Sequence, residues 1–288
     1  METLTHVQDA GAAPVGFLLA RTRKARRISQ MDLAGDAGVS ARHLSFVETG
    51  RARPSRELVL RLCDTLGVGP READAFLLAA GFAPAHRETP LEAPAMSEIL
   101  AALRLLLSRH DPLPAAAFDQ RYDYVMINAS YADYVNACLG AGADAVVGSG
   151  PVAPLTLLPA PRPNMLRLLC HPLGARRVLG NWAGVTREVL GRAAREVRAL
   201  PADPARQPPL DEVRRHPGVA SVLRTAPGSG LLVPVEIRQP DGGIARFMTT
   251  LSTVGTAQDL TLRELRIETF HPIAGSTEGV STAERESR

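Results

Sequence analysis

Two serine-capped helix starts, eleven residues apart, are the feature that most constrains this chain. Ser29 and Ser40 each follow a branched apolar residue and open a helical pattern, where a serine hydroxyl can accept a hydrogen bond from a free N–H of the first turn. In both cases the residue before the cap can pack against a leucine of the new helix. The two pairs are Ile28 with Leu33 and Val39 with Leu44. Gly38 between them can adopt the left-handed conformation that ends a helix in a tight turn, so the pattern predicts a helix-turn-helix.

The second of these helices has one apolar edge and one mixed face. Leu44 and Val47 form the inner edge, and Ala34 is small where the two helices must approach. The outward face is typical of a recognition helix, whose early residues meet base edges in the major groove. It comprises Ala41, Arg42, Ser45, Phe46 and Thr49. Arginine is well suited to bidentate contact with guanine, so we expect Arg42 to read a base.

Positive charge is concentrated around this motif. Residues 16–61 hold ten Lys or Arg and four Asp or Glu, a balance of +6, whereas the whole chain has a formal charge of +3. Arg51 and Arg53 follow the recognition helix, where phosphates would pass. Charge alone fits either a polyanion partner or a solvated arginine-rich surface. Together with the caps and the turn, it indicates binding to double-stranded operator DNA.

Several other classes of protein are not expected. The three cysteines are widely spaced, which argues against a disulfide scaffold or a CxxC site. No apolar stretch approaches the roughly 18 residues of a membrane helix, and no signal peptide is evident. Motifs of metal, nucleotide or nucleophilic catalysis are missing from the sequence. We therefore expect a cytoplasmic, nucleoid-associated protein that needs no cofactor, metal or membrane and is not an enzyme.

Composition and periodicity divide the chain into five parts. These are a flexible N-terminus (1–14), a helical domain (15–83), a linker with three prolines (84–95), a second domain (96–273) and a disordered tail (274–288). In the second domain we expect helices over 96–109, 129–139, 165–170, 185–200 and 210–216. Strands are expected near 122–128, 231–238, 244–254 and 263–270. The first of these lies in a longer stretch, 113–128, that looks extended throughout. The predicted fold class is α+β, an all-α five-helix domain followed by a domain with an antiparallel sheet.

The segment SQMDLAGDAGVSARHLSFVETGRARPSRELVLRLCDTLGV resembles the five-helix domain of XRE-type (Cro/CI-like) bacterial repressors. The resemblance covers about residues 15–80. It implies phosphate contacts by Gln30 and Ser40, and base contacts by Ala41, Arg42, Ser45 and Phe46. Phe46 stands where better-known members of the family often carry a polar side chain that contacts the bases. Two roles for Phe46 therefore stay open: it contacts a thymine methyl group, or it packs inward.

The remainder of the chain resembles the MmyB-like ligand-binding domain. The motifs are NMLRLLCHP (164–172), NW (181–182), HPGV (216–219) and the long stretch FMTTLSTVGTAQDLTLRELRIETFHP (247–272). The resemblance implies a PAS-like domain, a small antiparallel sheet with helices over one face that encloses a pocket. It also implies a fatty-acid-like ligand.

Large apolar side chains on inward-facing elements are the candidates for the lining of this pocket. They are Tyr124, Met126, Trp182, Leu251 and Val254. Each of them, taken singly, is more simply explained as core packing. The leading hypothesis is a homodimeric transcription regulator controlled by a small apolar ligand. The alternatives are a constitutive DNA-binding regulator whose second domain mediates dimerisation or protein interaction, and an autoregulated enzyme.

Overall fold

The computed structural model describes residues 15–139, 153–158, 162–199, 207–225, 231–239, 242–255 and 257–273. The chain forms two compact units, residues 1–88 with 258–260 (unit 1) and residues 89–257 with 261–288 (unit 2). The division falls within the predicted linker 84–95. The predicted N-terminal segment 1–14 and tail 274–288 lie outside the described residues.

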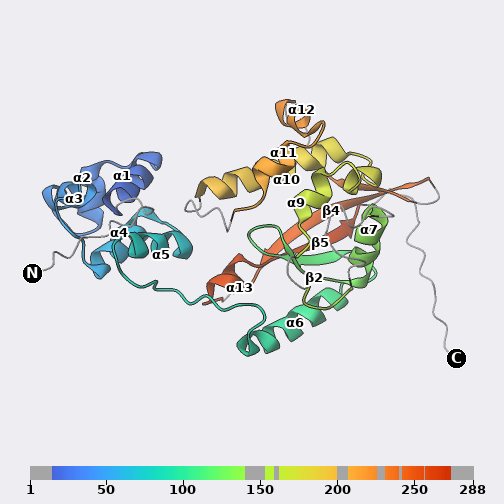
Figure 1. The fold of residues 1–288 in the computed structure, drawn as a ribbon, viewed down its shortest axis with the longest axis horizontal. Coiled ribbons are helices and arrows are strands. Elements are labelled where there is room, and N and C mark those ends of the chain that lie inside the picture. The colour runs from blue at the N-terminus through green and yellow to red at the C-terminus, as the bar shows by residue number, and fades with distance from the viewer. Residues whose placement is uncertain are drawn as a thin grey trace, which may run out of the picture. The chain divides into compact units, whose positions relative to one another are not determined.

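Unit 1 consists of short helices, as the caps predict (Figure 1). They are α1 Val15–Ala25, α2 Gln30–Asp36, α3 Ala41–Glu48, α4 Arg56–Leu66 and α5 Pro70–Ala79. The hydroxyls of Ser29, Ser40 and Ser55 accept hydrogen bonds of 3.0, 3.1 and 3.2 Å from backbone N–H groups of the next turn. The predicted caps of α2 and α3 are therefore confirmed, and Ser55 caps α4 in the same way.

One glycine in α1 lets two helices touch through their backbones. A Cβ atom added at Gly16 would lie 2.2 Å from the carbonyl oxygen of Val47 and 2.7 Å from that of Glu48. Any side chain at this position would therefore push α1 away from the end of α3. Sequence periodicity gave no sign of this close approach.

Unit 2 is built on one antiparallel sheet of five strands, in the order β2-β1-β5-β4-β3. The strands are β1 Ala115–Phe118, β2 Tyr124–Ile127, β3 Val235–Arg238, β4 Ile244–Thr253 and β5 Arg266–Pro272. The predicted α+β class and antiparallel sheet are confirmed. The extended stretch 113–128 proves to be two strands, and β1 pairs with both β2 and β5. Its sequence, three alanines and a phenylalanine, has little of the β-branched character that marks a strand.

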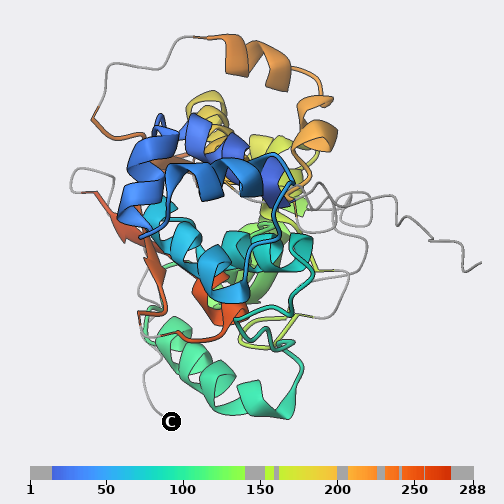
Figure 2. The same ribbon diagram turned by 90° about the vertical axis from the view of Figure 1, so that its left-hand side faces the viewer.

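Apolar residues cover both faces of the sheet, and each face has its own helices (Figure 1, Figure 2). The larger cluster packs α7 Ala129–Leu139, α9 Met165–Cys170, α10 Trp182–Ala199, α11 Leu210–Arg214 and α12 Val219–Arg224 on one face. On the other face, Leu103 and Leu107 of α6 Ser97–Ser108 join Ala117 and Ile267 of the strands. Shorter helical segments are η1 Pro94–Met96, η3 Ala175–Arg177 and α13 Leu260–Glu264. The expectation of helices over one face only was wrong, because both faces of the sheet are apolar.

One buried amide ties the start of the sheet to α7. Asn128 is fully buried, and its side-chain oxygen accepts hydrogen bonds from the N–H groups of Ala115 (2.9 Å) and Tyr131 (3.0 Å). Its NH₂ group donates to the carbonyl oxygen of Leu113 at 2.8 Å. Asn128 therefore caps α7 and fixes the chain that enters β1.

Replacing Asn128 with alanine should lower the free energy of unfolding of unit 2 by about 3 kcal/mol, because several buried backbone groups lose their partner. Guanidinium unfolding followed by the fluorescence of Trp182, the chain's one tryptophan, measures this change. Asp133→Ala, at an exposed position of the same helix, is the control and should change stability by less than about 0.5 kcal/mol. Equal effects of the two substitutions would contradict this role of Asn128.

Candidate nucleic-acid interface and ligand-binding surface

The turn between α2 and α3 has the predicted geometry. Gly38 has a φ of +67°, and the N–H of Val39 donates to the carbonyl oxygen of Ala34 at 2.9 Å. Leu44 and Val47 are buried, each 1% exposed, on the inner edge of α3. A Cβ atom added at Gly38 would meet nothing within 4 Å. Glycine is favoured at this position because of the positive φ angle, and not because a side chain would lack space.

A buried ion pair holds α3 against α1. The Arg23 guanidinium donates to both carboxylate oxygens of Glu48, at 2.7 and 2.9 Å. The side chains of Arg23 and Glu48 are 10% and 5% exposed. Burial by itself would raise the pKa of Glu48, but the hydrogen bonds from Arg23 and Gln30 outweigh burial and lower it. The pair is therefore charged at neutral pH.

The same carboxylate orients Gln30, a predicted phosphate contact at the start of α2. The amide nitrogen of Gln30 donates to Oε2 of Glu48 at 2.7 Å. An amide NH₂ group carries two hydrogens, so one remains to donate outward. The hydroxyl of Ser40, the second predicted contact of this kind, accepts from the N–H of His43 and keeps its own hydrogen for a phosphate.

The predicted base-reading residues lie together on α3, with different degrees of exposure. Arg42 is exposed, Ser45 and Phe46 are half-buried, and the methyl group of Ala41 packs partly against the core of unit 1. The guanidinium carbon of Arg42 lies 5.5 Å from the centre of the Phe46 ring. The ring of Phe46 is thus on the outward side of the helix, next to Arg42.

The loop after α3 folds back onto the end of that helix. The N–H groups of Arg51 and Ala52 both donate to the carbonyl oxygen of Phe46, at 2.8 and 3.1 Å, and Pro54 is buried. Arg51 and Arg53 are exposed between these two anchor points. The backbone therefore presents Arg51 and Arg53 from a fixed loop next to α3.

Loss of the buried ion pair should destabilise unit 1. Glu48→Gln leaves Arg23 buried without its counter-charge and should lower the free energy of unfolding by about 3 kcal/mol. The double variant Arg23→Met/Glu48→Leu should lose less than Glu48→Gln, because no unpaired charge stays buried. Urea unfolding followed by far-UV circular dichroism tests both.

The pH dependence of this stabilisation has a definite sign. The pKa of Glu48 is lower in the folded state than its ordinary value of 4.5. Its contribution is therefore complete above that value and is lost as the pH falls through the lower folded-state pKa. The stability difference between the wild type and Glu48→Gln should be constant near neutral pH and shrink only below pH 4.5. A difference that already changes between pH 6 and 8 would contradict the assignment.

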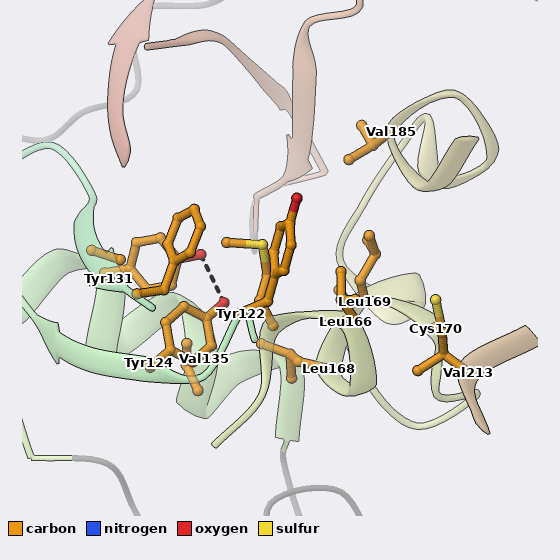
Figure 3. Close-up of a cluster of buried hydrophobic side chains, with 14 of the residues drawn as sticks. Tyr122, Tyr124, Tyr131, Val135, Leu166, Leu168, Leu169, Cys170, Val185 and Val213 are labelled. Carbon is orange, nitrogen blue, oxygen red and sulfur yellow. Dashed lines mark hydrogen bonds between the residues drawn. The ribbon is translucent and has the colours of Figure 1, made fainter. Parts of the chain in front are cut away.

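Aromatic rings fill the space between the sheet and the helices α7 and α9 (Figure 3). The hydroxyls of Tyr124 and Tyr131 are 2.9 Å apart, and the ring of Tyr131 lies edge-on to Phe270 at 5.7 Å. Phe118 and Tyr122 stack with their ring centres 5.4 Å apart. The centre of the expected apolar cavity is therefore packed core.

The five residues predicted to line the cavity do not meet. Tyr124 lies in the core on the α10 face, whereas Met126 and Val254 pack with α6 on the other face. A β-bulge separates Tyr124 from Met126, since Phe118 pairs with Tyr124 while Ala117 pairs with Met126. The extra residue, Val125, breaks the alternation that would place both side chains on one face. Leu251 is 39% exposed, and Trp182 is half-buried at the edge of the larger cluster.

An open depression of about 520 Å³ lies beside Trp182 at the edge of the sheet. Its lining consists of Arg176, Leu179, Gly180, Asn181, Trp182, Ala183, Gly184 and Arg238. The Arg176 guanidinium lies 3.6 Å from the centre of the Trp182 indole, and the indole N–H donates to the carbonyl oxygen of Leu169 at 2.7 Å. The depression thus combines an aromatic wall with two guanidiniums, a set that suits an amphipathic anion.

Pairing across the edge strand builds this surface. Leu179 forms an isolated antiparallel bridge with Ile237 of β3, and the N–H of Arg238 donates to the carbonyl oxygen of Val178 at 2.8 Å. Arg176 also donates to the carbonyl oxygen of Pro217 at 2.6 Å. Its Nε is buried without a hydrogen-bond partner among the described residues. The sequence gives no signal for the juxtaposition of Arg176 and Arg238, which are separated by about sixty residues.

Three further titratable side chains, those of Cys63, Cys170 and Glu268, are buried. Burial raises the pKa of the Cys63 and Cys170 thiols to about 12. Glu268 on β5 is buried next to Thr249, and burial raises its pKa to about 7. Among the described residues, no three His, Cys, Asp or Glu side chains are arranged to hold a metal ion. The same part of the chain holds no helix long and apolar enough to cross a bilayer.

Two known protein families match the chain, one in its N-terminal region and one in the remainder. A helix-turn-helix domain family matches residues 14–76. The family described as the MmyB-like transcription regulator ligand binding domain matches residues 99–282. No curated protein matches the chain significantly.

Proposed function

The chain belongs to the MmyB-like transcription regulators, and we propose that it reads its operator as a homodimer controlled by a fatty-acid-like ligand in unit 2. DNA binding follows from the helix-turn-helix domain. The open depression, which is lined by Arg176, Arg238 and Trp182, carries the ligand part of the proposal. A protein with this function is expected on chromosomal DNA.

The proposed DNA contacts divide into base readers and phosphate contacts. The base readers are Ala41, Arg42, Ser45 and Phe46, and the phosphate contacts are Gln30, Ser40, Arg51 and Arg53. Arg42 is the one exposed strong donor among the readers and suits a guanine edge. Phe46 lies beside it and suits a thymine methyl. The phosphate contacts fix the register of α3 in the groove but carry no sequence information.

Substitutions of Arg42 and Arg51 should separate the two classes of contact. Arg42→Ala should weaken binding to a sequence selected by the wild type from random DNA by about 1–3 kcal/mol, with little change on unselected DNA. Arg51→Ala should weaken binding to both DNAs alike and flatten the slope of log affinity against log salt by about one unit. Fluorescence anisotropy titrations over a salt series measure both effects. Equal losses for Arg42→Ala on the two DNAs would make it a phosphate contact.

The ligand proposal rests on the chemistry of the depression. A carboxylate head could pair with Arg176 and Arg238, and Leu179 and the Trp182 indole, which line the same depression, offer apolar surface for a chain. Each buried methylene contributes roughly 0.8 kcal/mol. Burial lowers the pKa of Arg176, so an anion there would restore interactions that its guanidinium lacks. The ligand can control transcription only by binding the DNA-competent and DNA-incompetent states with different affinity.

Palmitic acid should stabilise the protein more than hexadecanol, because only the acid carries the charge that the two arginines recognise. At a hundred times the dissociation constant the expected stabilisation is about 2.7 kcal/mol. Thermal unfolding and the quenching of Trp182 fluorescence report binding. Arg238→Ala should abolish the preference for the acid over the alcohol.

Arg195→Ala is the matched control for this experiment. Arg195 is an exposed arginine on the same helix as Trp182, about 20 Å further along its axis. This variant should keep the preference for the acid. A wild type that responds to neither lipid would remove the ligand proposal and leave a constitutive DNA-binding regulator.

A further inference from the structure

The outer face of α6 is apolar and exposed. Leu105 and Leu106 are 57% and 47% exposed, and Ala101 and Ala102 are exposed beside them. The opposite side of the helix is buried against the sheet through Leu103 and Leu107. A helix that is apolar on both sides is typical of one with a partner on both sides. The sheet is one of these partners, and the exposed leucines mark the surface for the second.

We propose that α6 is the dimer surface of this protein and that it packs antiparallel against α6 of a second copy. The proposal rests on the proposed function, in which a two-fold dimer reads two half-sites. In a two-fold interface the same surface of both subunits is in contact. A residue on one side of the axis therefore faces the partner residue that lies at the same distance on the other side of the axis. The composition of α6 fits this requirement in both size and charge.

A two-fold axis beside the middle of α6, between positions 103 and 104, produces complementary pairs. Ala102 faces Leu105 of the partner subunit, and Ala101 faces Leu106 of the partner subunit. Each leucine thus meets an alanine, which lets the two helices approach closely. Glu98, exposed in the first turn, faces Arg109 of the partner subunit, and Arg109 is exposed at the other end.

The charges select this orientation over the parallel one. A parallel arrangement would place Glu98 beside Glu98 of the partner subunit, and like charges at an interface are unfavourable. The antiparallel arrangement forms the Glu98–Arg109 pair twice by symmetry. With 12 residues, α6 is about 18 Å long, so this contact is smaller than a standard interface of about 1,600 Å². The dimer should therefore depend on protein concentration and be strengthened by operator DNA.

Sedimentation equilibrium of the full chain tests the surface. Leu105→Glu, Glu98→Arg and Arg109→Glu should each raise the dimer dissociation constant by at least about tenfold. The double variant Glu98→Arg/Arg109→Glu should restore dimerisation, since the exchanged charges again face each other. Leu231→Glu, at a fully exposed leucine of the same unit, is the control and should dimerise like the wild type.

Rescue by the double charge exchange distinguishes this contact from a structural effect within one chain. Glu98 and Arg109 are about 16 Å apart along a single helix, too far to compensate each other there. The charge variants decide the question even if Leu105→Glu folds poorly. A wild type that is monomeric at all concentrations, or a dimer that none of the three single substitutions weakens, overturns the proposal.

Operator binding provides the second readout. The single variants should bind the selected DNA more weakly and with lower cooperativity, while their binding to unselected DNA changes little. An intact wild-type dimer that fails to bind selected DNA would count against the proposed function and leave the α6 surface standing. If all three variants still dimerise and bind the selected DNA like the wild type, the α6 surface is wrong and the proposed function stands.

Discussion

The buried ion pair between Arg23 and Glu48 is the interaction on which the DNA-reading part of the molecule depends. It joins the last turn of α1 to the last residue of α3, and through Gln30 it also holds the start of α2. Helices of 7 to 11 residues are not stable alone in water. Their mutual orientation must come from tertiary contacts, and this network supplies a directional one beside the apolar core. At its other end, α1 touches the backbone of α3 at Gly16, so the two helices are held together at both ends of α1.

Unit 2 depends on a sheet that is apolar on both faces. β5 lies at the centre of the sheet between β1 and β4. Its residues Ile267 and Phe270, an odd number of positions apart, belong to different clusters, Ile267 with α6 and Phe270 with the aromatic core. Alternation along a strand sends successive side chains to opposite faces. The sheet therefore needs helices on both sides, and the long segment between β2 and β3 supplies most of them for one face.

The two proposed surfaces of unit 2 belong to opposite faces of this sheet. The depression beside Trp182 adjoins the larger cluster, whereas α6 packs on the smaller one. An effect of the ligand on a dimer formed through α6 would have to pass through the strands or around their edge. Arg238 of β3 lines the depression, so this edge strand is the part of the sheet that borders the proposed ligand site. Allosteric control thus requires an arrangement of β3 and β4 that differs between the two states.

Local chemistry in the sequence determined the helix starts, the tight turn at Gly38, the buried edge of α3 and most of the strands, because each depends on residues a few positions apart. It could not determine which distant residues meet. Arg23 and Glu48 are 25 positions apart, and Arg176 and Arg238 line one depression because Leu179 pairs with Ile237. Strict alternation placed Tyr124 and Met126 on one face, and a single bulge at Val125 separated them. Tertiary structure decided these features because they follow from strand register and helix approach, which local propensity does not specify.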